Sequence, residues 1–509
     1  MLVSQAPSLA LKVWGAVMAI TMRLGPVVLF GMIAGRRWQQ FGGFVSGCDP
    51  GNWFAFGRRL FGDGGKSTAG AYPPLVPTLL FIGQRVADLM IVARIVSLGS
   101  LIAVMAATYF VARQGTSRWF ALATAMTVGL ASIFSSTVAF GGYPQNYALA
   151  FGMLAAYAFA CYLETAAIRH LLGATAALVA AAISHHMYFA ISCAFIAVVW
   201  GIWLTTKPSW GAVLRRTCGS LFVGACGMAC FIPTFLLLKQ DGYGAPINIG
   251  RLNFPVAIHS SIREAPSLWL AVFTTGLLFI GISYKERFTA LWKVQTALMI
   301  APLALFAVTR EPRLIPPILI GASLAMGSAL HTLWLDSRGT AWVGIPLLLA
   351  AIVPVLLWPL SDAKAGEDIA YYRVADHSLI RTADWINAHP THGLVVIRQS
   401  ARGWPVGWWF EGLTHANIVV GSNLKYLAFP GERDHAALAN QFFDQQRTTK
   451  QARQFAAETG VSFLVFKKWE WIGWQAWTAE TDPALKIVFD DGEYMIVATN
   501  ADTAPSALG

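Results

Sequence analysis

Gly47-Cys48-Asp49-Pro50-Gly51-Asn52-Trp53 stands directly after the first strongly apolar stretch of the chain and runs on toward Tyr72-Pro73-Pro74-Leu75-Val76-Pro77. Asp49 is a lone carboxylate beside glycines, an aromatic residue and the basic pair Arg58-Arg59. A carboxylate at the end of a membrane segment, facing water, can take a proton from a substrate hydroxyl. The alternative is an ordinary solvated loop aspartate, and position alone does not separate the two interpretations.

The composition outside this stretch is that of a membrane protein. Of 509 residues, 56% are hydrophobic and 12% are charged, and the mean hydropathy is +0.54. A soluble protein of this size carries roughly twice that charged fraction. Several segments of about 20 residues contain few charges, which is enough to cross a bilayer core of roughly 30 Å. The sequence therefore predicts a polytopic α-helical membrane protein.

The net charge of +11 does not indicate a nucleic-acid partner, because the basic residues are scattered between apolar segments. Such residues are typical of topology determinants and of partners for anionic lipid head groups. The six cysteines show neither a disulfide framework nor the spacing of a zinc site.

Apolar runs of membrane-spanning length predict about eleven transmembrane helices. They are expected near residues 12–34, 87–111, 118–139, 147–163, 167–184, 187–206, 217–238, 267–284, 289–309, 313–333 and 341–360. The first outer loop is long, at about 35–86, and two short amphipathic helices near 52–61 and 75–83 are expected to lie flat at the membrane interface.

The short loops predict the orientation. One set of loops carries basic residues: Arg113, Arg118, Arg169, Lys207, Arg215, Arg216, Lys285, Arg287 and Arg338. The other set, around 141–144 and 184–186, contains no Lys or Arg. The positive-inside bias places the N-terminus in the cytoplasm. An odd number of spans then places Asp49 and the C-terminal region outside the plasma (inner) membrane, in the periplasm or extracellular space.

The composition becomes polar from Ser361 to the end, which predicts two domains: a transmembrane domain at 1–360 and an extracytoplasmic α/β domain at 361–509. Helices are expected at 378–388 and 435–458. Strands are expected at 393–398, 417–421, 461–466, 485–489 and 494–498, the last two as a hairpin.

A second group of candidate residues is Thr309-Arg310-Glu311-Pro312-Arg313-Leu314-Ile315-Pro316. Arg310 and Arg313 at the outer mouth of a helix suit a phosphate, because guanidinium binds phosphate oxygens bidentately and remains charged. Anchoring to lipid head groups is the alternative. Glu311 lies between them and is a candidate substrate-binding residue, or it simply neutralises the two arginines.

His185 and His186 interrupt an apolar run at the same predicted level. Adjacent residues on a helix point to different sides, so the two histidines cannot easily bind one metal unless the backbone forms a turn there. We expect one histidine to bind a phosphate oxygen or to cap the preceding helix. A third group of candidates is aromatic or acidic and suits sugar rings, with an interfacial aromatic belt as the alternative. Its members are Trp53, Tyr72, Tyr143, Trp404, Trp408, Trp409 and Glu411.

In their order and common side, these features resemble the GT-C class of membrane glycosyltransferases. The resemblance covers most of the chain. It includes the acid after the first helix, the Tyr72-Pro73-Pro74-Leu75 element, Gly142-Tyr143-Pro144 in the second outer loop, the helix start at 310–316 and a C-terminal α/β domain.

The resemblance implies an inverting hexosyl- or pentosyltransferase that moves a sugar from a polyprenyl-phosphate donor to a glycan, lipid or protein acceptor. Asp49 would be the general base. Arg310 and Arg313, with His185 or His186, would hold the phosphate leaving group. Many members carry further acidic residues in the second outer loop and use a divalent metal, but Gln145 and Asn146 stand there in this chain. We therefore expect no metal or other cofactor.

Two other functions fit a protein of this composition. A transporter or flippase for lipid-linked glycans predicts ionisable residues at mid-membrane depth and internal symmetry. Apart from Arg23 and Arg94, the sequence shows few ionisable residues at that depth, and it shows no internal repeat. A scaffold whose C-terminal domain binds a partner leaves the grouping of Asp49 with Arg310 and Arg313 on one side unexplained.

Overall fold

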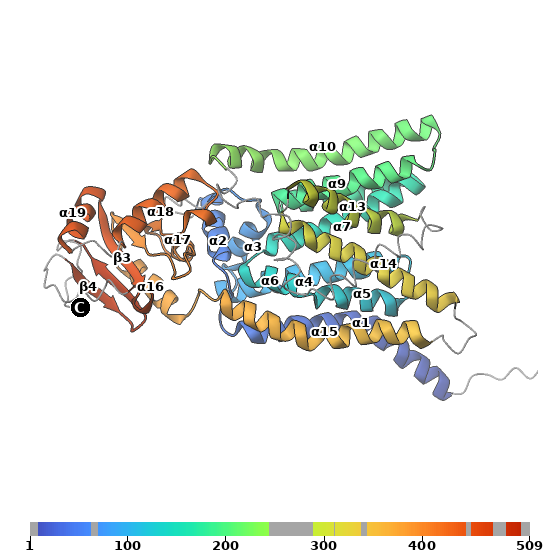
Figure 1. The fold of residues 1–509 in the computed structure, drawn as a ribbon, viewed down its shortest axis with the longest axis horizontal. Helices are drawn as coiled ribbons and strands as arrows, with labels where there is room; N and C mark the ends of the chain where they lie inside the picture. Colours follow the sequence, from blue (N-terminus) through green and yellow to red (C-terminus); the bar gives the residue numbers. More distant parts are fainter. Residues whose placement is uncertain are drawn as a thin grey trace, which may run out of the picture.

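The computed structural model describes residues 9–62, 70–243, 289–309, 311–336, 344–443, 449–471 and 485–499. A bundle of long helices forms most of the molecule, and a smaller domain with a β-sheet lies against one end of the bundle (Figure 1). The two short helices of the first loop lie at that same end, between the bundle and the smaller domain.

The bundle is that of a multi-pass membrane protein. Within the described residues, seven helices are long and apolar enough to cross a membrane, or eight if one bent pair is counted as a span. The seven are α4 (Leu89–Arg113), α7 (Tyr143–Thr165), α9 (His186–Leu204), α10 (Trp210–Gln240), α13 (Ala290–Thr309), α14 (Ile315–Asp336) and α15 (Gly344–Tyr371). Two further apolar helices are α1 (Leu9–Phe41) and α8 (Ile168–Ala182). The expected helix at 267–284 lies outside the described residues, so the number eleven remains a prediction.

The expected single helix at 118–139 is wrong. The segment forms α5 (Arg118–Gly129) and α6 (Ser132–Phe140), bent by 47°, because Ala131 adopts an extended backbone. The bend brings the end of α6 to the first loop. Gly47, with φ +94°, lies so close that a Cβ atom there would be 2.3 Å from the carbonyl oxygen of Phe140. Glycine is required at this contact between the first loop and the turn that follows α6.

The first loop forms α2 (Asp49–Leu60) and α3 (Leu75–Gly83), close to the expected ranges. Pro50 lies in the first turn of α2, where no backbone N–H is needed. The expectation that α2 lies flat on the lipid surface is wrong, because eight of its twelve residues are buried. It packs against α3 and against α17 (Gly407–Leu413) of the C-terminal domain. A Cβ atom on Gly51 would lie 2.7 Å from the backbone nitrogen of Trp409, so the two helices touch through their backbones.

The C-terminal domain contains a five-stranded sheet with the order β2-β1-β3-β5-β4. Its strands are β1 (Leu394–Ile397), β2 (Asn417–Val420), β3 (Val461–Lys467), β4 (Lys486–Asp490) and β5 (Tyr494–Ala498). β1 pairs in parallel with β2 and β3, and β5 pairs antiparallel with β3 and β4. All five expected strands are confirmed to within about a residue. Strands β1 and β5 are continuous apolar runs, and β3 is apolar except for Ser462 and the terminal Lys467, because both faces of these strands are covered.

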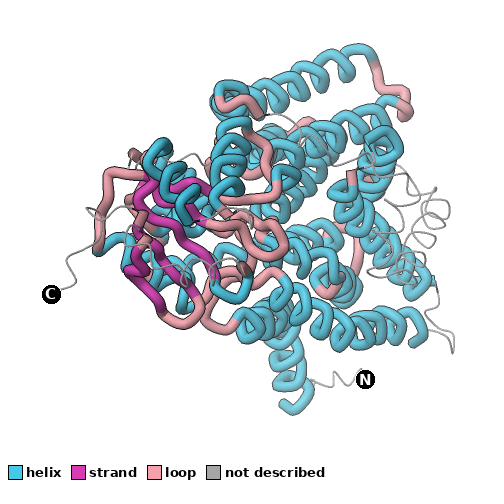
Figure 2. The backbone as a smooth tube through the Cα atoms, turned by 60° about the vertical axis from the view of Figure 1, so that its left-hand side comes forward, coloured by secondary structure: helices cyan, strands magenta, loops and turns pink. Residues whose placement is uncertain are grey.

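Helices cover both faces of this sheet, which lies at the end of the bundle (Figure 2). Side chains of α16 (His377–Ala388) and α17 pack on one face, and those of α18 (Pro430–Phe442) and α19 (Thr449–Thr459) pack on the other. The expected single helix at 435–458 is wrong, because α18 begins five residues earlier and ends at Phe442. The membrane helix α15 continues past 360, the expected end of the first domain, to Tyr371.

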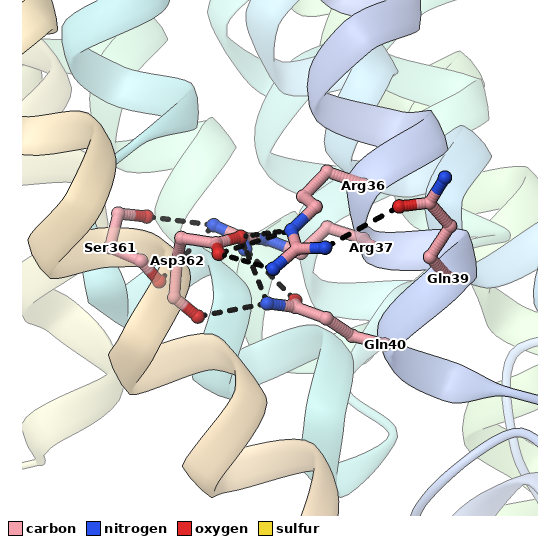
Figure 3. A network of polar contacts seen from close by, with 6 residues as sticks. All are labelled: Arg36, Arg37, Gln39, Gln40, Ser361 and Asp362. Atoms are coloured by element: carbon pink, nitrogen blue, oxygen red, sulfur yellow. Dashed lines mark hydrogen bonds and ion pairs between the residues drawn. The ribbon is translucent and has the colours of Figure 1, made fainter.

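A polar network joins α1 to α15 just before the first loop (Figure 3). Asp362 accepts hydrogen bonds from the guanidinium groups of Arg36 and Arg37, at 2.9–3.1 Å, and from the amide of Gln40 at 2.9 Å. Arg37 also donates to the hydroxyl of Ser361 at 2.8 Å, and its side chain is only 3% exposed. These bonds fix where the first loop leaves the bundle.

Candidate functional site

Four separate segments bring their candidate residues together at the end of the bundle that faces the C-terminal domain. They are the start of α2, the turn between α6 and α7, the turn between α8 and α9, and the segment 311–314 before α14. The backbone N–H of Leu75 donates to the carbonyl of Ile183 at 2.9 Å, which ties the first loop to the α8–α9 turn. These four segments, which the sequence predicts on one side of the membrane, therefore lie at the same end of the bundle.

Asp49 is the first residue of α2 and is partly buried. A Cβ atom built on Gly141 would lie 3.0 Å from the Cβ of Asp49, so the turn between α6 and α7 packs directly on this residue. Within the described residues no donor forms a hydrogen bond with the carboxylate. Burial raises the pKa of Asp49 from 3.8 to about 7, and the positive charge of Arg313 opposes this rise. A carboxyl group that titrates near neutrality is suited to general-base catalysis.

Arg313 supplies the positive charge of the site. It lies in the 3₁₀ turn Pro312–Leu314, and its backbone carbonyl accepts a hydrogen bond from the hydroxyl of Tyr188 at 2.6 Å. Its guanidinium pairs with Glu311, with 2.7 Å from Nε to Oε1. Glu311 therefore does neutralise this arginine in the structure. Arg310 lies outside the described residues, and its role remains a prediction.

The two histidines lie side by side, where the chain turns from α8 into α9. His185 has an extended backbone (φ −159°, ψ 123°) and precedes α9, so the helical rule for adjacent residues does not apply. Their rings stack with centroids 4.8 Å apart. His185 caps the following helix, not the preceding one, because its Nδ1 accepts from the backbone N–H of Tyr188. His186 Nε2 lies 3.2 Å from the hydroxyl of Tyr243.

The second nitrogen of His186 is a candidate contact for a ligand. Nδ1 is buried and has no hydrogen-bond partner within the described part of the chain. If Nε2 accepts the proton of Tyr243, Nδ1 carries the ring hydrogen and is a donor without an acceptor. A buried donor of this kind is destabilising unless a ligand or water satisfies it.

A continuous cluster of aromatic rings connects the surroundings of Asp49 with the histidines. Trp53 lies between Tyr143, at 5.3 Å between ring centroids, and Tyr72, at 5.7 Å. Tyr72 in turn lies 5.8 Å from His185 and 6.0 Å from His186. Burial raises the pKa of Tyr72 well above its ordinary value, so its hydroxyl stays protonated. The candidates Trp53, Tyr72 and Tyr143 are thus brought together.

The candidates on α17 divide into two groups. Trp408 lines a pocket beside Asp49, whereas Trp409 is completely buried and donates from Nε1 to the carbonyl of Gly47 at 2.9 Å. Glu411 is buried on the same helix but is not among the residues that line the pocket. Burial and the charge of Glu411 raise the pKa of Glu432, on α18, to about 8.

The sequence did not identify Tyr188 or Tyr243 as parts of the site. Both are ring neighbours of the histidines, at 5.4 Å from His185 and 5.3 Å from His186 respectively. Tyr188 lies only two residues after His186, and this closeness along the chain is a signal in the sequence. Tyr243 reaches the site from the end of α10, and no local pattern indicates that contact.

The fold is similar to those of known membrane proteins, although the sequence is not. No protein-family model matches the chain, and no curated protein matches it in sequence. Among solved structures, ArnT from Cupriavidus metallidurans bound to undecaprenyl phosphate has a TM-score of 0.58 and 15% identity, over 95% of this chain and 99% of that one.

Two further structures align over nearly the whole chain. The arabinofuranosyltransferase AftD from Mycobacteria has a TM-score of 0.63 and 15% identity, over 94% of this chain, which spans 40% of the AftD length. The oligosaccharyltransferase AglB from Archaeoglobus fulgidus, in complex with an inhibitory peptide and a dolichol-phosphate, has a TM-score of 0.51 and 12% identity, over 96% of this chain and 75% of that one. The chain therefore has the GT-C-like fold: a polytopic helical membrane domain followed by a C-terminal α/β domain.

Proposed function

We propose that this protein is an inverting glycosyltransferase that moves a sugar from a polyprenyl-phosphate donor to an acceptor hydroxyl at the outer face of the plasma membrane. One observation carries the proposal. A carboxylate that titrates near neutrality, Asp49, lies at one end of a membrane bundle within the electrostatic influence of Arg313. The GT-C-like fold supports the same reaction, since glycosyltransferases with this fold occur with polyprenyl phosphates.

The reaction needs one base and one cationic group. Asp49 accepts the proton of the acceptor hydroxyl while the oxygen of that hydroxyl forms a bond to the anomeric carbon. The bond from that carbon to the phosphate oxygen breaks, and the phosphate leaves with the electron pair. Displacement from the opposite side inverts the anomeric configuration. Arg313 stabilises the negative charge that develops on the phosphate, and Nδ1 of His186 is placed to donate to it.

Glu311 gives this proposal a specific feature. It pairs with Arg313 in the structure, so a donor phosphate has to replace a carboxylate as the partner of the guanidinium. Arginine binds both oxyanions bidentately, and an exchange of partners keeps the charge of Arg313 compensated. Arg310, beside Glu311 in the sequence, belongs to the same proposed phosphate site.

We further propose that the reaction needs no metal. Gln145 and Asn146 lie in the first turn of α7 and are both uncharged. Asn146 is buried and donates to the hydroxyl of Ser100 at 3.3 Å. Within the described residues, no group of three His, Cys, Asp or Glu side chains is arranged to hold a metal ion. In this proposal, arginine compensates the negative charge of the leaving phosphate.

The test is sugar transfer in liposomes with a panel of polyprenyl-phosphate sugars, comparing wild type with Asp49→Asn. The exchange removes the base and preserves the size of the side chain. We expect transfer to be lost while donor binding persists, and the exposed control Asp434→Asn to behave as wild type. Full transfer by Asp49→Asn would exclude Asp49 as the base. Movement of donor across the liposome membrane without transfer would instead establish a flippase.

A further inference from the structure

A pocket of about 260 Å³ opens beside Asp49, where the bundle meets the C-terminal domain. Asp49 forms part of its wall. Five large aromatic residues line the pocket as well: Phe140 at the end of α6, Tyr372 after α15, Trp404 and Trp408 around the start of α17, and Tyr426 in the 3₁₀ turn Leu424–Tyr426. Both domains are therefore needed to form it.

Neighbouring groups hold these aromatic rings in place. Tyr372 and Trp404 stack with centroids 5.4 Å apart and an angle of 21° between their planes. The guanidinium of Arg402 lies 5.0 Å from the ring of Trp404 and donates to the carbonyl of Tyr371 at 2.7 Å. Trp408 is buried, whereas Tyr426 is 39% exposed at the mouth. The aromatic wall is thus largely formed before any ligand binds.

The chemistry of this wall favours one class of ligand. A sugar ring has an apolar C–H face and a rim of hydroxyl groups. It matches flat aromatic faces whose edges carry polar N–H and O–H groups. Among the described residues that line the pocket there is one carboxylate and no Lys or Arg, so an anionic head group lacks a cationic partner. The volume is below the roughly 300–1,000 Å³ of drug-sized pockets, which limits the ligand to about one or two rings.

We propose that this pocket binds the acceptor, and that the acceptor is a neutral carbohydrate. One of its sugar rings stacks on the wall formed by Tyr372, Trp404 and Trp408, and a hydroxyl of that ring faces Asp49. Tyr426 contacts the ring from the mouth of the pocket. This inference rests on the proposed glycosyltransferase activity, and it selects a glycan over a lipid or a peptide as the acceptor.

The first measurement compares acceptor classes in the full-length protein in nanodiscs. Labelled polyprenyl-phosphate sugars are offered with neutral oligosaccharides, with serine- and threonine-containing peptides, or with hydroxylated lipids. For the acceptor that is used, KM is measured for acceptor and donor separately in Trp404→Ala, Tyr426→Ala and Tyr426→Phe. Trp469→Ala is the matched control, because Trp469 is 67% exposed in the same domain and lies outside the pocket.

We expect transfer to oligosaccharides, with acceptor KM raised roughly tenfold in both alanine variants and donor KM unchanged. Tyr426→Phe should restore the wild-type acceptor KM, because it keeps the ring that stacks. Transfer to the peptide or lipid hydroxyl, or an acceptor KM that neither alanine variant changes, would overturn the carbohydrate pocket and leave the proposed glycosyltransferase intact.

If no donor supports transfer, the proposed function fails. The binding of oligosaccharides to the protein then tests the carbohydrate pocket separately. Saturation-transfer NMR with the same neutral oligosaccharides then measures contact between their ring protons and the protein. A signal in wild type that is lost in Trp404→Ala and kept in Trp469→Ala supports the carbohydrate pocket. No signal in wild type, or a signal that Trp404→Ala retains, overturns it.

Discussion

Raising the pH from 6 to 8 should increase the rate of sugar transfer about tenfold, because Asp49 must be ionised to accept a proton. With a pKa of about 7, the ionised fraction is about 9% at pH 6 and about 91% at pH 8. The sign follows from the role of the carboxylate: a base gains activity as the pH rises through its pKa, whereas a general acid would lose it.

The assay is the pH dependence of kcat/KM, which reports the pKa values of the free enzyme. In Arg313→Gln the rising limb should move to higher pH, because the positive charge that lowers the pKa of Asp49 is gone. Glu432→Gln is the control, since Glu432 also has a pKa in this range, at about 8, but lies on α18 of the C-terminal domain. In Glu432→Gln, kcat/KM should rise with pH over the same range as in wild type.

Three results would refute this reasoning. The first is a profile that is flat between pH 6 and 8. The second is the loss of the rise in kcat/KM with pH in Glu432→Gln, which would assign the titrating group to the C-terminal domain. The third is residual activity of Asp49→Asn that still rises tenfold over the same range, because the titrating group would then be another one.

The remaining predictions concern the docking of the domains, the α1–α15 network, the phosphate site and metal ions. Gly51→Ala should lower the thermal unfolding temperature, with a loss of about 1–3 kcal/mol from overpacking against the backbone of α17, whereas Gly43→Ala, which has open space around it, should not. Asp362→Ala should lower the unfolding temperature further, with a loss of about 3–5 kcal/mol in the free energy of unfolding, because Arg37 would be left as a buried charge without its carboxylate partner. An unchanged melting curve would contradict this. Arg313→Gln should weaken donor binding roughly 10- to 100-fold in a direct binding assay, from the loss of a charge-assisted pair, and equal affinity would remove it from the phosphate site. Transfer should survive treatment with EDTA, and loss of activity that Mg²⁺ or Mn²⁺ restores would establish a metal requirement.

Much of the architecture follows from local patterns. Helix α3 and the five strands lie at or within about one residue of their expected bounds, because apolar runs, prolines and turn residues define them locally. The common side of Asp49 and the segment around Arg313 follows from counting spans and basic loops. The sequence therefore indicates which end of the molecule holds the proposed site.

Features that depend on contacts between distant segments could not be predicted. The packing of α2 against α17 depends on the contact between Gly51 and the backbone of Trp409. Nothing in the sequence of either segment alone predicts this contact. The stacking of His185 on His186 was missed because it depends on where α9 begins, and a shift of one residue changes which rule applies. Tyr243 belongs to the site through the path of α10, which is a property of helix packing.

The network around Asp362 also has a consequence for the timing of biosynthesis. Arg37 and Asp362 are 325 residues apart, and at about 5–20 residues per second a ribosome needs roughly 15–65 s to add that length. During this interval the first loop has left the ribosome, while the helix that anchors it and the domain that covers it have not been made. A nascent chain therefore carries Asp49 without its surroundings, and the proposed activity begins only after the last membrane helix and the C-terminal domain have been synthesised.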